Sequence, residues 1–125
     1  MKTIFIVDDN DANLLIAKNA LDGMYETYAL PSAERMFKLL EKIKPDLILL
    51  DVDMPKMDGF EAMQKLKSDD SLKTIPVIFL TAKQDSESER QGFEIGAIDF
   101  ISKPFSQPVL LKRIEMHIDV VDKLE

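Results

Sequence analysis

Three short runs of aliphatic and β-branched residues constrain the fold more than any other feature of the chain. They are Thr3–Val7 (TIFIV), residues 47–50 (LILL) and residues 77–80 (VIFL). Apolar runs of this length, without alternating polar residues, are typical of strands that are covered on both faces, and such strands occur in parallel sheets. We therefore expect a parallel sheet with these runs at its centre.

Segments with a helical spacing of apolar residues lie between these strands. The clearest sets are Leu14, Ala17 and Leu21; Met36, Leu39, Leu40 and Ile43; and Phe60, Met63 and Leu66. Weaker strands are indicated at Glu26–Leu30 and at residues 99–101, and Asp11 and Ser32 are expected to cap the first two helices. The alternation predicts an α/β fold of five strands and five helices, with helices on both faces of the sheet.

The composition limits the kind of site that such a fold can carry. The chain has 125 residues, and we expect one domain over residues 1–125. With no Cys and one His, disulfides, thiolate zinc sites and multi-histidine metal clusters are excluded. The net charge of -7 argues against direct binding of nucleic acid. No run approaches ~18 apolar residues and no signal peptide is present, so we expect a cytoplasmic protein without membrane contact.

Acidic residues follow two of the predicted inner strands. Asp8 and Asp9 come directly after the first run, and Asp51 comes directly after the run at residues 47–50. The carboxyl ends of parallel strands meet at one edge of the sheet, so these carboxylates should converge. Crowded carboxylates take up protons unless a cation neutralises them, and a small set of oxygen ligands suits Mg²⁺. The sequence therefore predicts a magnesium site.

A hydroxyl and an ammonium group are expected at the same edge of the sheet. Thr81 follows the fourth predicted strand and Lys103 follows the fifth. Each residue alone also fits an ordinary role in a strand end or a solvated loop, but together with Mg²⁺ they can surround a phosphoryl group. Asp51 is then the natural nucleophile, because a carboxylate that attacks phosphorus forms an acyl phosphate.

Five motifs in this order resemble the receiver domain of bacterial two-component response regulators. They are Asp8-Asp9, Asp51, Met54-Pro55-x-x-Asp58-Gly59, Thr81-Ala82 and Lys103-Pro104-Phe105. The resemblance spans essentially the whole chain. It implies a flavodoxin-like, doubly wound (βα)5 fold with a five-stranded parallel sheet in the order 2-1-3-4-5.

The resemblance also implies a role for each residue of the site. Asp51 would accept a phosphoryl group from the phosphohistidine of a sensor histidine kinase or phosphotransfer protein. Asp8 and Asp9, with Asp51 and the backbone carbonyl of Asp53, would hold Mg²⁺. Thr81 and Lys103 would bind the phosphoryl oxygens, and the Lys103–Pro104 peptide is expected to be cis. Such a domain catalyses only its own phosphorylation and slow dephosphorylation.

Phe100 matches the position of the switch aromatic in this family. Phosphorylation would draw Thr81 toward the phosphoryl group and admit Phe100 into the space that Thr81 leaves. The signal would then pass through the face formed by the fourth helix, the fifth strand and the fifth helix. This face is also a candidate homodimer interface, and an output domain beyond residue 125 is a further expected partner.

Two positions that vary within the family are occupied here by residues of opposite charge. Asp53 lies two residues after Asp51, and Lys83 lies two residues after Thr81. Both would flank the path of the water that hydrolyses the acyl phosphate. We hypothesise that an Asp53–Lys83 contact modulates that water; a plain solvated pair is the alternative.

The last predicted helix carries two apolar lines. Leu110, Ile114, His117, Val121 and Leu124 form a short heptad pattern, and Leu111 and Ile118 form a neighbouring line. One line is expected to face the sheet. The pattern fits ordinary packing, a dimer face, or a helix that continues into an output domain.

A second function class remains open from the residues alone. Asp51-x-Asp53 after an apolar strand resembles the signature of haloacid-dehalogenase-type phosphatases, with Asp51 as nucleophile and Asp53 as acid. Those enzymes have Thr or Val where Pro55 stands here, and they place their second acidic pair late in the chain. Turnover of small phosphate esters would indicate the phosphatase, whereas a single stoichiometric aspartyl phosphate would indicate the receiver.

Overall fold

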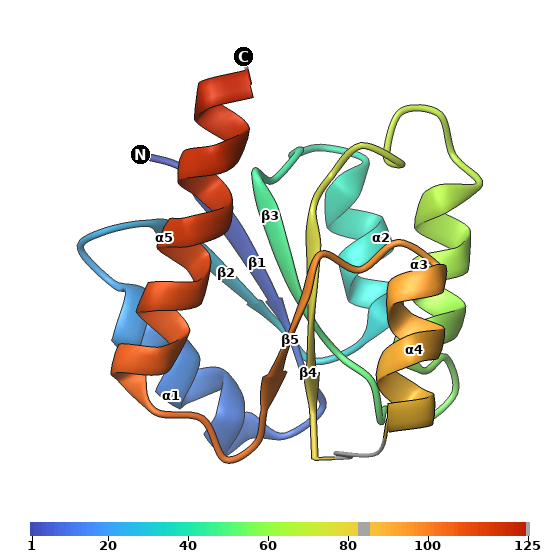
Figure 1. Cartoon of the computed structure of the whole chain (residues 1–125), viewed down its shortest axis with the longest axis horizontal. Coiled ribbons are helices and arrows are strands. Elements are labelled where there is room, and N and C mark those ends of the chain that lie inside the picture. Colours follow the sequence, from blue (N-terminus) through green and yellow to red (C-terminus); the bar gives the residue numbers. More distant parts are fainter. Residues whose placement is uncertain (83–85, 125) are drawn as a thin grey trace.

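The computed structural model describes residues 1–82 and 86–124, and it alternates strands and helices from end to end (Figure 1). The elements are β1 (Thr3–Val7), α1 (Asp11–Leu21), β2 (Glu26–Leu30), α2 (Ala33–Leu40), β3 (Leu47–Asp51), α3 (Gly59–Lys67), β4 (Val77–Thr81), α4 (Ser86–Glu94), β5 (Asp99–Ser102) and α5 (Gln107–Leu124). All neighbouring strands pair in parallel, in the order β2-β1-β3-β4-β5. The predicted flavodoxin-like α/β fold is confirmed.

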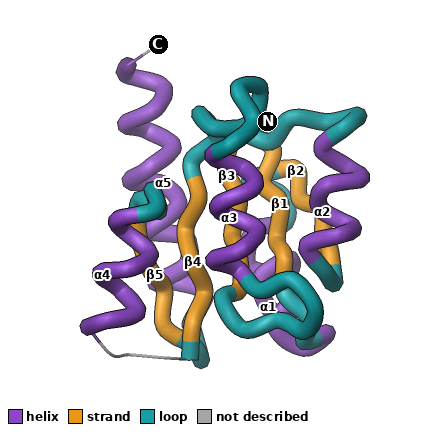
Figure 2. Tube along the Cα trace, turned by 90° about the vertical axis from the view of Figure 1, so that its right-hand side faces the viewer, coloured by secondary structure: helices purple, strands orange, loops and turns teal. Residues whose placement is uncertain are grey.

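Helices cover both faces of the sheet, as right-handed crossovers require. Helices α1 and α5 lie on one face, and α2, α3 and α4 lie on the other, where Figure 2 shows them in front of the strands. Alternate side chains of β1 enter the two cores: Ile4 and Ile6 pack toward α1 and α5, and Phe5 and Val7 pack on the opposite side. Successive residues of a strand point to opposite faces, so one apolar run supplies both cores.

The two strands with the weakest sequence signal, β2 and β5, form the edges of the sheet. Every residue of β3 and of β4 is buried, whereas β2 has no buried residue and β5 has one. Edge strands are covered less completely than inner ones, so their sequences carry more polar residues and a weaker strand pattern.

Two helix boundaries differ from the expectation. The cap of α1 is Asn10, whose side chain accepts a hydrogen bond from the Asn13 N–H, because the chain is still extended at Asn10 and is already helical at Asp11. Ser32 does cap α2, as predicted, by accepting from the Arg35 N–H. Helix α2 ends at Leu40, so Ile43 lies beyond the helix on which its spacing had placed it.

The buried line of α5 also differs from the predicted heptad line. Leu110, Ile114 and Ile118 are buried in the core, whereas His117 turns toward β5 and its Nε2 lies 2.9 Å from Asp99 Oδ2. A helix that packs on a flat sheet keeps its own period of 3.6 residues, so the heptad period of a coiled coil does not continue. The side chains of Val121 and Leu124 lie outside the described residues.

Within the part of the chain that the structure describes, no helix has both the length and the apolar character needed to cross a membrane.

Candidate functional site

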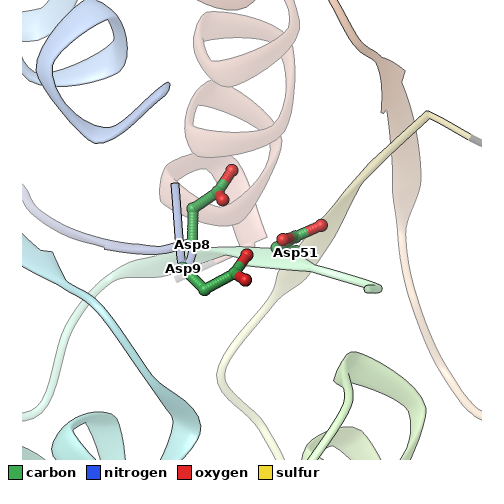
Figure 3. Close-up of side chains that lie close together, drawn as sticks. All are labelled: Asp8, Asp9 and Asp51. Carbon is green, nitrogen blue, oxygen red and sulfur yellow. The ribbon is translucent and has the colours of Figure 1, made fainter. Parts of the chain in front are cut away.

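Three carboxylates from two neighbouring strands meet at the carboxyl edge of the sheet (Figure 3). Asp8 and Asp9 directly follow β1, and Asp51 is the last residue of β3, which pairs with β1 so that Val7 aligns with Leu50. One oxygen of each carboxylate lies within 4.8 Å of the others. Asp8 is 0% exposed and Asp51 is 2% exposed, whereas Asp9 faces solvent. The predicted convergence of these three residues is confirmed.

The ammonium group of Lys103 lies against the two buried carboxylates. Lys103 Nζ is 2.8 Å from Asp8 Oδ2 and 2.9 Å from Asp51 Oδ1. The position of Lys103 follows from the sheet, because its backbone N–H donates to the carbonyl of Thr81 at 2.9 Å and so extends the pairing of β4 with β5. The next peptide bond, Lys103–Pro104, is cis, as the resemblance implied.

Backbone hydrogen bonds fix the end of β3 and the Asp51 carboxylate. The Val52 N–H donates to the Leu80 carbonyl at 3.0 Å, which keeps the chain in register with β4. The Asp53 N–H donates to Asp51 Oδ1 at 3.2 Å. The carboxylate is therefore held in place by groups that do not depend on a ligand.

Burial is the main influence on the charge of this site. Burial raises the pKa of Asp51 from its usual 3.8 to about 7, and the Asp8 carboxylate adds to this effect against the opposing ion pair with Lys103. Burial also disfavours the charge on Lys103, but the ion pairs with Asp8 and Asp51 outweigh it and hold the pKa of that ammonium above its usual value.

This arrangement predicts how Asp51 affects stability in the metal-free protein. A folded-state pKa raised to about 7 means that Asp51 stabilises the fold most below pH ~4 and loses this contribution as the pH rises through about 7. We expect Asp51→Asn, in the presence of a chelator, to increase the free energy of unfolding at pH 8 by about 2 kcal/mol and to change it much less at pH 5. Urea unfolding at both pH values measures this; an Asp51→Asn protein that is less stable than the parent at pH 8 would contradict it.

The donor set fits a hard divalent cation. Among the residues that the structure describes, three carboxylates gather beside one ammonium group, so negative charge is in excess there. The buried oxygens Asp8 Oδ2 and Asp51 Oδ1 share the Lys103 ammonium, at 2.8 and 2.9 Å. An all-oxygen site with this excess of negative charge suits Mg²⁺, which binds few carboxylates and keeps several waters.

The remaining predicted site residues lie on β4, on β5 and in the loop after β3. Thr81 is the last residue of β4, is 3% exposed and aligns with Ser102 of β5. The ring of Phe100 packs on that of Phe79, with the centroids 5.5 Å apart. The Asp53 side chain is exposed and is not part of the close carboxylate group. Lys83 lies outside the described residues, so its contact with Asp53 stays a hypothesis.

Gly59 is a functional position that sequence reasoning recorded only as part of a motif. The first residue of α3 lies directly on the backbone that carries Asp51, and its N–H donates to the Val52 carbonyl at 2.9 Å. A Cβ atom on Gly59 would overlap the carbonyl oxygen of Asp51 and stand 2.8 Å from Val52 Cα. Both neighbours are backbone atoms, so neither can move without displacing the site.

We therefore expect Gly59→Ala to lower the free energy of unfolding by about 2–3 kcal/mol, the upper part of the usual cost of overpacking, and to slow any reaction of Asp51. Gly23→Ala is the matched control, because a Cβ there meets nothing within 4 Å and only the positive φ of 87° opposes it. Chemical denaturation of both variants provides the measurement. Equal destabilisation by the two substitutions would show that the contact with Asp51 is unimportant.

The model of the response regulator receiver domain matches residues 4–115 of this chain. The chain belongs to the response regulator receiver domain family. Asp51-x-Asp53 is thereby assigned to a receiver, and the phosphatase alternative is not supported. The fold and the convergence of the three carboxylates agree with the family that the motifs in the sequence suggested.

Relatives of this receiver domain include short proteins and parts of longer ones. A probable cyclic di-GMP phosphodiesterase of Vibrio cholerae is 40% identical over 116 residues, which cover 93% of this chain and 26% of the relative. The polar-differentiation response regulator DivK of Brucella anthropi is 36% identical over 121 residues, which cover 94% of this chain and 96% of DivK. The chain thus spans only about a quarter of the first relative.

Solved receiver structures have the same fold. A CheY-like receiver domain protein from Methanospirillum hungatei superposes with a TM-score of 0.91 at 28% identity, covering 100% of this chain and 99% of that chain. The chemotaxis protein CheY4 of Vibrio cholerae gives a TM-score of 0.88 at 28% identity, with 93% and 98% coverage.

Proposed function

We propose that this receiver domain is a Mg²⁺-dependent phosphoacceptor switch. Asp51 takes a phosphoryl group from a sensor histidine kinase or a phosphotransfer protein. The observation that carries the proposal is the position of Asp51, buried at the end of β3 with Asp8 and Asp9 beside it and Lys103 Nζ at 2.9 Å. A phosphoacceptor role fits this geometry and the family.

Asp8, Asp9 and Asp51, with the backbone carbonyl of Asp53, are the proposed metal ligands. The donor set supports this assignment, because three carboxylates within 4.8 Å of one another carry more negative charge than the Lys103 ammonium neutralises. When bound, Mg²⁺ neutralises phosphoryl oxygens and the charge that develops during transfer.

In the transfer step, an Asp51 oxygen attacks the phosphorus of the donor. A P–O bond forms to Asp51, the P–N bond to the donor imidazole breaks, and its electron pair returns to the ring nitrogen. The Asp53 N–H keeps the carboxylate in position through its contact with Oδ1. Lys103 and the Thr81 hydroxyl bind phosphoryl oxygens, so the ammonium that neutralises Asp51 before transfer neutralises its product afterwards.

The proposed output follows from the charge that phosphorylation adds, about -1.5 to -2. Thr81 moves toward the phosphoryl group and Phe100 moves into the space it leaves, which alters the α4–β5–α5 face. Phe93 of α4 and Met116 of α5 expose about half of their surface, 49% and 50%, which supports a contact role for this face. We propose that it binds a second copy of the chain or a downstream partner.

The remaining elements of the proposal concern the protein around this domain. We expect a cytoplasmic protein with residues 1–125 as one receiver unit, without direct binding to nucleic acid or membrane. A covalently linked output domain beyond residue 125 is supported by relatives in which the matched region is half of the length or less. Examples are the Vibrio cholerae protein, at 26% of its length, and PhoB of Pseudomonas aeruginosa, at 50%.

Incubation with acetyl phosphate and Mg²⁺, followed by intact-mass measurement, tests the proposed function. We expect one phosphoryl group per chain, lost slowly after the donor is removed, and no steady turnover of p-nitrophenyl phosphate. Unmodified protein, or continuous ester turnover, would contradict the proposal.

A further inference from the structure

The Phe100 ring rests on α4 at a residue that has no side chain. A Cβ atom on Gly92 would overlap Cζ of Phe100, and it would stand 3.0 Å from Cε2 of the same ring and 3.1 Å from Cδ2 of Phe79. Gly92 is buried in the last turn of α4, where Ala would be the better helix former by up to about 1 kcal/mol. A glycine at this position therefore weakens the helix locally and gives room to the ring.

Aromatic contacts hold the ring at this place from two further directions. Phe93 of α4 meets it edge to face with the centroids 5.0 Å apart, and Phe79 of β4 lies 5.5 Å away. Phe79 also contacts Phe60 of α3 at 5.3 Å. We call the surface made by Gly92, Phe93 and Phe79 the Phe100 ring site. It joins α4 to the inner strand that ends in Thr81.

The register of the sheet puts this ring site next to Thr81. Phe79 aligns with Phe100, and Thr81 aligns with Ser102, two pairs further along the same two strands. Residues two apart in a strand share a face, so Phe79, Thr81 and Phe100 all point toward the α4 side of the sheet. Thr81 is therefore the next residue of β4 on the face that carries the ring.

We propose that Gly92 is the positioning residue that holds the Phe100 ring against α4 in the unphosphorylated protein. This inference rests on the proposed function, and it adds a specific residue to it. Because residue 92 lacks a side chain, the ring site accommodates the Phe100 ring until Thr81 moves. The contact between Phe100 and Gly92 thereby links α4 to the state of Asp51. A methyl group at residue 92 closes the ring site. The displaced ring then favours the state in which Thr81 has moved toward Asp51 and left room for it, because an apolar ring is more stable buried than in water.

The test compares the parent with Gly92→Ala by the positions of backbone amide NMR signals from β4, α4 and β5. The free parent and the parent saturated with Mg²⁺ and beryllofluoride define the two end states. We expect signals of free Gly92→Ala to lie on the line between these states, displaced toward the beryllofluoride end, with the ratio of the two states raised about tenfold. Acetyl phosphate should also modify the variant several-fold faster.

A Phe100→Leu background separates the contact from the helix propensity of Ala. Leu lacks the far edge of the ring, so Gly92→Ala should cause no displacement in that background, whereas an effect of propensity alone would persist. Gln91→Ala changes an exposed neighbouring position of α4, and its amide signals should stay at the positions of the free parent.

Three results would overturn the inference. In the first, the Gly92→Ala signals lie at the positions of the free parent or are displaced away from the beryllofluoride end. In the second, Gly92→Ala causes the same displacement with and without Phe100→Leu. In the third, the Gly92→Ala protein does not fold, because the Phe100 ring then has no alternative buried position. A parent that does not respond to beryllofluoride would instead contradict the proposed function. The two failures are therefore distinguishable.

Discussion

Asp51→Asn is expected to abolish phosphoryl incorporation from acetyl phosphate, with a loss of at least about 1,000-fold in rate. The amide of Asn is a poor nucleophile and cannot form a stable acyl phosphate. Its shape is nearly that of Asp, so the Asp53 N–H can still donate to the side-chain oxygen and the end of β3 stays in place. The loss would therefore report chemistry and not misfolding, which intact-mass measurements over time can quantify.

Asp53→Asn is the matched control for this prediction. Residue 53 is only two positions away, carries the same charge and is exposed, but its carboxylate is not in the close group at the site. The control should retain phosphorylation within about tenfold of the parent, since its backbone N–H is unchanged. Incorporation that survives in Asp51→Asn and disappears in Asp53→Asn would reverse the assignment.

Lys103→Met is expected to have the second largest effect, on stability as well as on reaction rate. The substitution leaves the carboxylates of Asp8 and Asp51 buried without their shared cation. Removing one partner of a buried ion pair is strongly destabilising, and we expect a loss of about 3 kcal/mol at pH 8 in the absence of metal. Phosphorylation should slow about 100-fold, because an ammonium that stabilises the transferring oxygens is gone.

The pH and metal dependence of this loss identify its cause. At pH 5 the loss should be smaller, because Asp51, with its pKa raised to about 7, is then protonated and needs no cation. Mg²⁺ at pH 8 should restore part of the stability by replacing the missing charge. Lys44→Met removes an exposed ammonium elsewhere and should change stability by less than about 0.5 kcal/mol. A loss in Lys103→Met that is the same at both pH values and insensitive to Mg²⁺ would contradict the ion-pair account.

Most of the fold was predictable because its inner strands carry a strong signal. The runs that became β1, β3 and β4 are apolar apart from their terminal residues, since helices cover both of their faces. The edge strand β2 was readable only from its β-branched and aromatic residues. The strand order itself came from the family resemblance, because hydrophobic patterns do not specify which strands are neighbours.

The site was predictable for a topological reason. All strands run in the same direction, so residues that follow Val7, Leu50 and Leu80 must meet at one edge of the sheet. Positions along the chain were sufficient to gather Asp8, Asp9 and Asp51. They did not show that Lys103 contacts Asp8 and Asp51 together, since that depends on the direction of a long side chain.

Contacts between distant elements were beyond sequence reasoning. The carboxylate of Asp99 binds Arg113 Nη1 at 2.7 Å as well as His117, which explains why His117 leaves the apolar line of α5. The close approaches at Gly59 and Gly92 were invisible for a similar reason: a glycine in the sequence does not reveal which atom would meet its missing Cβ. Contacts of this kind can be identified only from the three-dimensional structure.

Locating the phosphoryl group tests the central claim most directly. Treatment of the phosphorylated protein with borohydride reduces an aspartyl phosphate to homoserine, and tandem mass spectrometry of the peptides then identifies the residue. We predict homoserine at residue 51 alone, and only when Mg²⁺ was present during phosphorylation. Homoserine at another aspartate, or equal labelling of Asp51 with Mg²⁺ and with a chelator, would contradict the account.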